Sequence, residues 1–371
     1  MASDPSRIET IRKKTGAGTP LDAAELLYLY NTNDMSLLAA LSGEVRERLN
    51  GANVYYNRNF HLEPSNVCVH RCKFCSYRRN TEEEAGAWTM SLEEVKQYCR
   101  EKYIPGMTEV HIVGSVNPRR DFNYYLNIVK EVKKLLPPEV KIKGYSAIEI
   151  ADMCASAGIP VKEGLVRLKA AGLDAIPGGG AEIFNREIRE KICPDKPDAQ
   201  VWLQVHREAH QLGLHTNATM LFGHIENREH RIEHLLMLRE LQQQTGGFDA
   251  FIPLKYRSFH NELGKEIREA DLIEVLKTFA VSRLALHNIR HIKAYWPMLG
   301  KELCQLSLLF GADDIDGTIN DSTKIYSMAG AEEKNPGLSA AELEQLAAHA
   351  GFTAVERDSY YNIIPKTQLG K

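Results

Sequence analysis

No run of apolar residues in this 371-residue sequence is long enough to cross a lipid bilayer, and this absence argues against a membrane-spanning helix. The first residues, MASDPSRIETIRKK, carry charge, and no apolar stretch follows them, so we expect no secretory signal. Acidic and basic residues are interspersed and give a formal charge of -3, which provides no broad basic field for a phosphate backbone. We therefore expect a cytoplasmic protein that binds neither membranes nor nucleic acid.

Disulfide bonds are not expected either, because the chain has an odd number of cysteines, seven, and cytosolic proteins rarely form disulfides. Four cysteines are scattered, and we interpret them as small buried apolar side chains: Cys99, Cys154, Cys193 and Cys304. The other three lie in the segment CVHRCKFCSYRR, residues 68–79. Such clustering is typical of metal ligands.

Short apolar or β-branched runs alternate along the chain with amphipathic segments of helical period. The expected strands cover residues 60–67, 109–115, 141–147, 173–177, 215–222, 248–256, 291–296 and 312–317. Alternating βα units over about 260 residues predict a closed (β/α)8 barrel of the TIM type. A doubly wound parallel sheet is the alternative.

The two ends of the chain predict additional helices outside this barrel. Segments such as TPLDAAELLYLY predict helices that cap the barrel, and LSAAELEQLAAHAG predicts a helix in a C-terminal tail. The expected division is an N-terminal helical cap over residues 1–55, the barrel over 56–320 and a C-terminal extension packed on the barrel over 321–371.

Polar and glycine-rich segments follow most of the expected strands. They are the cysteine segment and GSVNP, GYSAIE, PGGGAE, TNATMLFGHIE, PLKYR and KAYW. Because a barrel keeps its active site at the carboxyl ends of its strands, we expect these segments to meet at one mouth. The glycines of PGGGAE would let the backbone approach a bound cofactor or substrate closely.

The spacing of the three clustered cysteines indicates an iron-sulfur cluster that is open at one corner. Cys68, Cys72 and Cys75 follow C-x3-C-x2-C, whereas electron-transfer clusters with four irons are closed by four cysteines. Three ligands leave one iron free to bind a substrate or cofactor, as an open coordination position does in catalytic zinc sites. The alternative is a zinc site completed by His70, although a ligand so close to its neighbours would crowd a tetrahedron.

This motif, with Phe74 before its last cysteine, resembles the signature of the radical S-adenosylmethionine superfamily. The resemblance implies a [4Fe-4S] cluster on the three cysteines, S-adenosylmethionine bound to the open iron, and Phe74 near the adenine. It also implies a reducing partner such as flavodoxin or ferredoxin. Where the superfamily usually has Gly-Glu after its second strand, this chain has Gly114 and Ser115, whose carbonyls and hydroxyl can still accept from the methionine ammonium.

Several further segments look like one branch of that superfamily, which contains aminofutalosine synthase, dehypoxanthine futalosine cyclase and the deazaflavin (FO) synthase subunits. These segments are PGGGAEIF, ICPDK, TNATMLFGHIE, TGGFDAFIPLKYR and HIKAYWPMLG. HLEPSNVCVHRCKFCSYRR, KICPDK and TNATMLFGHIE are most similar to the aminofutalosine synthase family. That resemblance implies addition of the 5'-deoxyadenosyl radical to 3-[(1-carboxyvinyl)oxy]benzoate, aryl migration and loss of bicarbonate, giving 6-amino-6-deoxyfutalosine for menaquinone synthesis.

The resemblance also suggests cofactor-binding positions beside the cysteines. Ser146 and Glu149 follow the third expected strand, where the superfamily often places groups that meet the ribose or the methionine carboxylate. Glu149 has a second interpretation, as an acidic residue in the first turn of the next helix.

A substrate with two carboxylates requires cationic or hydrogen-bonding groups at the mouth. The candidates are Arg78, Arg79, His224, Lys255, Tyr256, Arg257, Lys293, Asn217 and Thr219, of which Arg78 and His224 are the leading ones. Strand alternation places Asn217 and Thr219 on one face, and we expect this face to point inward because outward polar groups would be covered by helices. For the charged residues the alternative is a solvated loop position.

Two other enzymes of the branch remain as alternatives, namely the cyclase and the deazaflavin synthase subunit. A non-catalytic iron-sulfur electron carrier is a different class, and the three-cysteine count argues against it.

Overall fold

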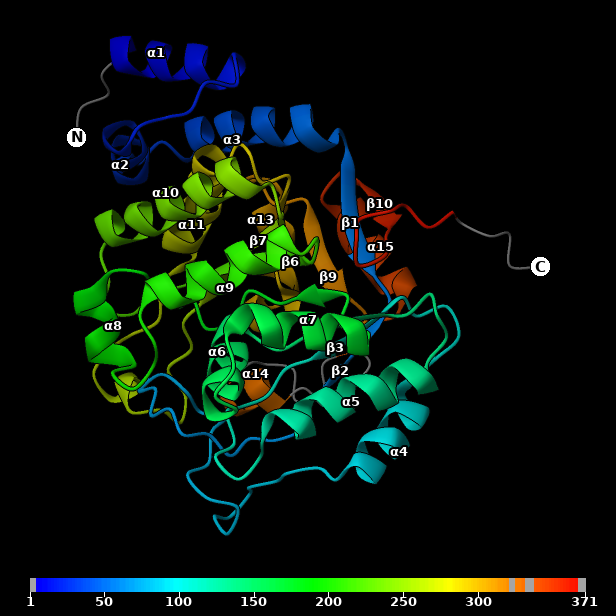
Figure 1. Cartoon of the computed structure of the whole chain (residues 1–371). Helices are drawn as coiled ribbons and strands as arrows, with labels where there is room; N and C mark the ends of the chain where they lie inside the picture. Colours follow the sequence, from blue (N-terminus) through cyan, green and yellow to red (C-terminus); the bar gives the residue numbers. More distant parts are fainter. Residues whose placement is uncertain (1–4, 320–323, 331–336, 366–371) are drawn as a thin grey trace.

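In the computed structural model, the structure describes residues 5–319, 324–330 and 337–365. Its central element is a parallel sheet in which seven strands follow one another in chain order (Figure 1). These strands are β2 (Asn59–Leu62), β3 (Glu109–Ile112), β4 (Lys141–Gly144), β5 (Ala175–Ile176), β6 (His215–Phe222), β7 (Phe248–Lys255) and β8 (His291–Ile292). The sequence predicted all seven, and the expected α/β class with a parallel sheet of barrel type is confirmed.

The eighth expected strand lies outside this sheet. β9 (Asp314–Gly317) pairs with β1 (Asn53–Asn57), which also pairs with β10 (Thr353–Glu356) in a separate three-stranded sheet. One isolated parallel bridge, between Lys293 and Asp314, connects β9 to the end of β8. The expected closed ring of eight strands is therefore a seven-stranded sheet with a small second sheet along its open side.

The second sheet forms because β1 leads almost directly into β2 and so brings the N-terminal strand to the open edge. The Thr318 hydroxyl donates to the Asn59 carbonyl at 2.9 Å, and the Asn59 amide donates back to the hydroxyl at 3.0 Å. The sequence interpretation missed β1 and β10, because it assigned their segments to helical terminal regions.

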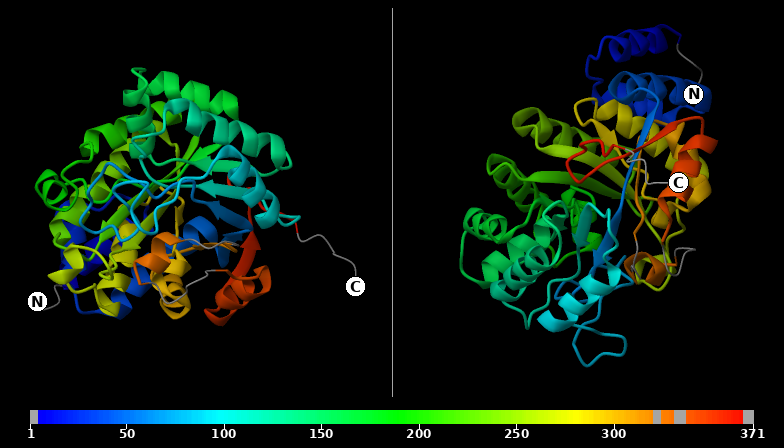
Figure 2. Two further views of the ribbon diagram at one scale, coloured as in Figure 1. Left: turned by 90° about the horizontal axis from the view of Figure 1, so that it is seen from below. Right: turned by 90° about the vertical axis from the view of Figure 1, so that its right-hand side faces the viewer.

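Helices surround the outer face of the sheet, as the two further views in Figure 2 show. Those that connect the strands are α4 (Leu92–Lys102), α5 (Phe122–Leu135), α6 (Ala147–Ser156), α7 (Val161–Ala171), α8 (Arg186–Ile192), α9 (Ala199–Gln211), α10 (Arg228–Thr245), α11 (Leu272–Ala285), α12 (Trp296–Leu299) and α13 (Lys301–Leu308). None of the helices in the described residues is long and apolar enough to span a bilayer.

The N-terminal region is helical, as expected. It forms α1 (Pro5–Gly16), α2 (Ala23–Asn31) and α3 (Met35–Asn50). α3 packs on α11, and α2 packs on α10 and α11, so these helices cover two outer helices of the barrel. The division of the chain at residues 55 and 320 stays a prediction.

The C-terminal segment is fastened to the barrel by buried polar contacts. The expected helix is α15 (Ala340–His349), which follows the short α14 (Lys324–Met328) and precedes β10. After β10, the fully buried Arg357 donates two hydrogen bonds to Asp314 Oδ2, at 2.7 and 3.0 Å. The Ser359 hydroxyl then donates to Glu109 Oε2 at 2.6 Å. These contacts bring the end of the chain to the first residue of β3.

Candidate functional site

The three clustered cysteines lie on the loop that follows β2, at the carboxyl end of the sheet. The thiol of Cys72 is buried, those of Cys68 and Cys75 are partly exposed, and none of the three forms a disulfide. Backbone hydrogen bonds hold the loop, from Cys68 N to Arg79 O at 3.0 Å and from Lys73 N to Ile192 O at 2.8 Å. The loop is therefore fixed independently of any metal.

His70 is engaged elsewhere and is not available as a ligand. Its Nε2 lies 2.7 Å from Asp152 Oδ2, and its Nδ1 lies 3.0 Å from the Asp195 carbonyl oxygen. Among the described residues, no three His, Cys, Asp or Glu side chains are arranged around one metal ion. A multi-iron cluster does not need such an arrangement, because each thiolate binds a different iron.

The cysteines lie near one cation, Lys196. Burial raises the pKa of Cys72 and of Cys68, and the positive charge of Lys196 acts in the opposite direction on both. Lys196 Nζ lies 2.5 Å from Glu182 Oε1 and 5.5 Å from the centre of the Phe74 ring. Three thiols without disulfide partners fit an iron-sulfur cluster, because bound iron replaces the thiol protons and stabilises the thiolates.

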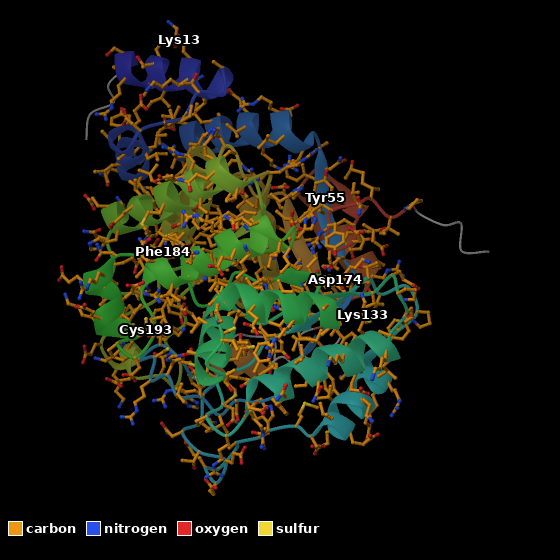
Figure 3. All side chains as sticks on the ribbon, viewed as in Figure 1. Lys13, Tyr55, Lys133, Asp174, Phe184 and Cys193 are labelled. Carbon is orange, nitrogen blue, oxygen red and sulfur yellow. The ribbon has the colours of Figure 1, made fainter. Side chains whose placement is uncertain are left out.

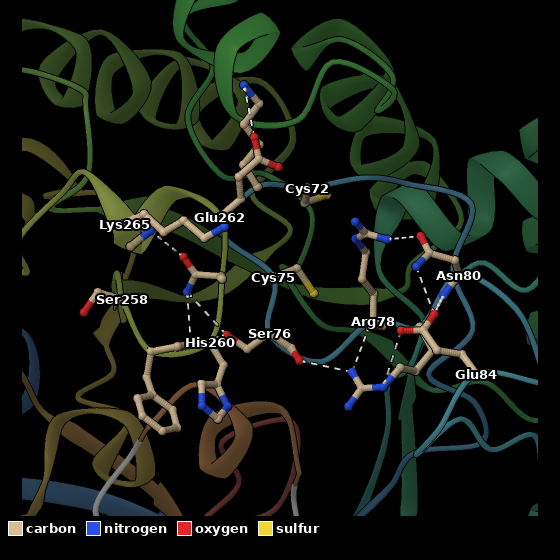
Figure 4. A pocket seen from close by; sticks show the side chains of 15 residues that line it. Cys72, Cys75, Ser76, Arg78, Asn80, Glu84, Ser258, His260, Glu262 and Lys265 are labelled. Carbon is tan, nitrogen blue, oxygen red and sulfur yellow. Dashed lines mark hydrogen bonds and ion pairs between the residues drawn. The ribbon is translucent and has the colours of Figure 1, made fainter.

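A pocket of about 760 Å³ opens beside these cysteines (Figure 4). Cys72, Cys75 and Arg78 line it, and the Arg78 guanidinium donates to Asn80 Oδ1. Arg79 also lines it, but its guanidinium donates to the carbonyl oxygens of Arg78 and Ala85, at 2.9 and 3.0 Å. Arg79 thus shapes the loop, whereas the predicted Arg78 is brought to the mouth next to the cysteines.

Gly114 and Ser115 follow β3 and pack against residues 65–67, which lead into the cysteine loop. The Ser115 hydroxyl lies 2.6 Å from the Val67 carbonyl oxygen and 3.0 Å from that of Ser65. A Cβ atom on Gly114 would lie only 2.9 Å from the Ser65 carbonyl oxygen, so the position requires glycine. Their predicted contact with the cofactor stays a prediction.

Ser146 and Glu149 form the capping box of α6. The Ser146 amide donates to Glu149 Oε2 at 2.7 Å, and the Glu149 amide donates to the Ser146 hydroxyl at 3.3 Å. Glu149 Oε1 also accepts from the Gly114 amide at 3.2 Å. Burial raises the pKa of Glu149, while the hydrogen bonds from Ser146 oppose that rise. The interpretation of Glu149 as a first-turn helix acid is therefore the one that the geometry supports.

Asn217 and Thr219 point inward, as strand alternation predicted. Both line a cavity of about 90 Å³, whose other lining residues come from β2, β3, β4, β7 and β9 and include Gly178, so it lies inside the curved sheet. The Thr219 hydroxyl donates to the Gly178 carbonyl at 2.6 Å. A Cβ atom on Gly178 would lie 2.7 Å from the backbone of β6, so this glycine permits close packing of strands.

Four predicted substrate-binding side chains line neither the mouth pocket nor the inner cavity. They are His224, Lys255, Tyr256 and Arg257. The His224 side chain is buried, with Nδ1 2.9 Å from Glu226 Oε2. Lys255 and Arg257 both pair with Glu269, at 3.3 and 3.4 Å. Lys255 and Arg257 thus share one acid that lines neither cavity, and the predicted contacts of all four side chains with substrate stay predictions.

Of the charged groups that line the inner cavity, the sequence analysis named Lys293 but missed Lys143, Glu109 and Asp316. Lys143 Nζ lies 2.7 Å from Glu109 Oε2, and Lys293 Nζ lies 2.6 Å from Asp316 Oδ1. All four side chains are nine-tenths or more buried. The signal that could have revealed them was a pair of opposite charges at inward positions of neighbouring strands, in EVHI and KIKG.

Comparison with known proteins supports this assembly. The family model described as "Radical SAM superfamily" matches residues 62–238, and the one described as "CofH/MqnC C-terminal region" matches residues 245–369. The chain is 42% identical over 361 residues to "Aminodeoxyfutalosine synthase" of Thermus thermophilus, covering 96% of both chains. Over 95% of its length it is also 34% identical to the "5-amino-6-(D-ribitylamino)uracil--L-tyrosine 4-hydroxyphenyl transferase" of Methanococcoides burtonii, of which 98% is covered.

A solved structure also supports the fold. The crystal structure of methylornithine synthase (PylB) matches with a TM-score of 0.73 and 18% identity, covering 93% of this chain and 97% of that one. At this identity the match supports the fold alone.

Proposed function

Since the chain belongs to the radical S-adenosylmethionine superfamily, whose enzymes use a [4Fe-4S] cluster and S-adenosylmethionine, we propose that it transfers the 5'-deoxyadenosyl group to 3-[(1-carboxyvinyl)oxy]benzoate. The proposed products are 6-amino-6-deoxyfutalosine, methionine and bicarbonate. The observation that carries this proposal is the 42% identity to an aminodeoxyfutalosine synthase over 96% of both chains.

In this proposal, Cys68, Cys72 and Cys75 hold the cluster. When bound, the reduced cluster supplies the electron that cleaves S-adenosylmethionine. Phe74 and Arg78 lie at the mouth. Phe74 lies near the adenine of S-adenosylmethionine, and Arg78 binds a substrate carboxylate. Arg78 suits this role because it lines the same pocket as Cys72 and Cys75.

Asn217 and Thr219 bind the substrate inside the sheet, where both line the inner cavity. We further propose a flavodoxin or ferredoxin as the electron donor and a cytoplasmic location. A radical intermediate needs protection from water, and an interior site provides it.

The second candidate is transfer of the tyrosine side chain to 5-amino-6-(D-ribitylamino)uracil, because relatives with that name share 34% identity with nearly the whole chain. The cyclase of the same branch is a third outcome that the experiment must distinguish.

The test uses anaerobically reconstituted protein, dithionite and S-adenosylmethionine, with each acceptor in a separate reaction. Mass spectrometry identifies the products. We expect a covalent adenosyl adduct with the enol ether and none with tyrosine plus the ribityl uracil. A hydroxyphenyl product from the second mixture, or ring closure of dehypoxanthine futalosine, would replace the proposal with one of the other two reactions.

A further inference from the structure

We infer that Lys143 and Lys293, which both line the cavity inside the sheet, bind the carboxylate on the aromatic ring of the substrate. This inference rests on the proposed function, adds Lys143 to the candidates, and assigns Lys293 to one of the two substrate carboxylates. It concerns the cavity lined by Asn217 and Thr219, not the mouth pocket beside the cysteines.

The two lysines are presented to one cavity from opposite parts of the sheet. Lys143 lies on β4, and Lys293 directly follows β8. Both line the cavity of about 90 Å³, which can hold several waters or the end of a substrate. Burial lowers the pKa of Lys143, the Glu109 carboxylate opposes this shift, and the positive charge of Lys293 adds to it. Because Glu109 and Asp316 each pair with one lysine, a bound carboxylate would be held by the remaining N–H donors of the two ammonium groups.

Each ammonium group retains hydrogen-bonding capacity toward the cavity. An ammonium has three N–H donors. Among the described residues, Lys143 has one acidic oxygen within hydrogen-bonding distance, on Glu109, and Lys293 has one, on Asp316. The Asn217 carboxamide, 4% exposed, has no hydrogen-bond partner in the described part of the chain and lines the same cavity. A carboxylate could therefore accept from both lysines and from this amide.

The acids behind the lysines are held by the C-terminal segment. Glu109 accepts from the Ser359 hydroxyl at 2.6 Å as well as pairing with Lys143. Asp314, which lies 3.9 Å from Lys293 Nζ, accepts two hydrogen bonds from Arg357. These outer contacts orient the acids, and the acids in turn fix the two ammonium groups in place.

The position of the lysines selects the ring carboxylate over the enol carboxylate. Cys72 and Cys75 line the mouth pocket, whereas none of the three cysteines lines the cavity that holds Lys143 and Lys293. The enol double bond must face the cofactor at the cysteine end. The ring carboxylate, attached across the aromatic ring, then points toward Lys143 and Lys293.

The experiment measures binding without turnover. Isothermal titration of reconstituted, unreduced protein with S-adenosylmethionine present compares the enol ether with 2-phenoxyacrylate, which lacks the ring carboxylate. We expect the protein to bind the enol ether about 10- to 100-fold more tightly, the range for hydrogen bonds to a charged group. In Lys143→Gln and Lys293→Gln this preference should fall by about tenfold or more, because only the charge is removed while a donor for the acid remains.

The matched control is Lys133→Gln. Lys133 and Asp174, both labelled in Figure 3, pair at 3.0 Å, and Asp174 also accepts from Tyr360 of the C-terminal segment. Neither residue of this pair lines the cavity. Lys133→Gln should retain the full preference for the enol ether over 2-phenoxyacrylate. If Lys143→Gln does not fold, Glu109→Gln/Lys143→Met removes both charges of the pair and serves in its place.

The outcomes separate the two proposals. If the unmodified protein neither binds nor adenosylates the enol ether, the proposed function fails and this inference fails with it. If it adenosylates the enol ether but the lysine variants keep the full preference over 2-phenoxyacrylate, only the inference is overturned.

Discussion

His70 Nε2 lies 2.7 Å from Asp152 Oδ2, and this contact ties the cysteine loop to α6 rather than to a metal. We predict that His70→Ala keeps the iron and sulfide content of the reconstituted protein. It should lower the free energy of unfolding by about 1 to 3 kcal/mol, because Asp152 and the Asp195 carbonyl lose their partner. Iron and sulfide analysis and urea unfolding measure both effects.

The control for this variant is His349→Ala, on the last turn of α15, where the side chain is exposed. Its unfolding free energy should change little. Loss of iron from His70→Ala, with the fold intact, would contradict our account and return His70 to the ligands.

Cys72→Ser should abolish the cluster. The cluster has three cysteine ligands, so the loss of one leaves only two thiolates, and a serine hydroxyl is a poor substitute for a thiolate. We expect loss of the visible absorption of the reconstituted protein and loss of reductive S-adenosylmethionine cleavage. Cys304→Ser is the matched control, because Cys304 is also buried but its thiol donates to the Ala294 carbonyl, at 3.4 Å, and this variant should keep both properties. Retention of the absorption by Cys72→Ser would refute the ligand assignment.

Arg357→Leu should destabilise the fold. The Arg357 guanidinium is completely buried and donates twice to Asp314, so its removal leaves a buried carboxylate without its main partner. We predict a loss of about 3 to 5 kcal/mol in the free energy of unfolding, measured by urea titration. Arg186→Ala removes an arginine that is 88% exposed and should cost less than about 1 kcal/mol. Equal losses in the two variants would be incompatible with a fastening role for the C-terminal segment.

Glu226 makes stability depend on pH in the acid range. Burial raises its pKa, but the contacts with His224, Arg231 and the Gly223 amide outweigh burial and bring the pKa to about 2, from 4.5. Because the pKa of Glu226 is lower in the folded protein than in the unfolded chain, the ionised carboxylate stabilises the fold above pH 4.5. This stabilisation is lost as the pH falls from 4.5 toward 2. The loss amounts to about 3 kcal/mol.

Glu226→Gln lacks this titrating group. Its unfolding free energy should therefore fall less steeply between pH 4.5 and 2 than that of the unmodified protein, as followed by urea titration at each pH. Glu240→Gln, on the exposed face of α10, should keep the steep fall. Identical pH profiles for the unmodified protein and Glu226→Gln would exclude Glu226 as the source.

The parts of the fold that local pattern determines were predictable from the sequence. The bounds of β6 were predicted to the residue because His215–Phe222 lies between two glycines, Gly213 and Gly223. The cysteine motif could be found from the spacing of its three cysteines alone. β1 and β10 were not predictable in this way. β1 pairs with β10 and with β9, which both lie near the other end of the chain, and local pattern carries no information on such pairing.

The same distinction explains the site residues. Asn217 and Thr219 follow from alternation on one strand. The partnership of Lys143 with Glu109 depends on the register of β3 against β4, and the burial of His224 depends on Glu226 and on the helix that carries Arg231. A basic residue near a strand end was therefore a poor guide, because its place relative to the cavities depends on contacts between distant parts of the chain.

The central claim is that the adenosyl carbon skeleton of S-adenosylmethionine becomes part of the product. The most direct measurement supplies S-adenosylmethionine labelled with carbon-13 in the ribose, together with the enol ether and reductant, and follows the label by mass spectrometry. The account predicts the label in a product that also contains the aromatic ring. The account would be contradicted if the label appeared only in free 5'-deoxyadenosine, while the enol ether was recovered unchanged or gave a product that contained no label.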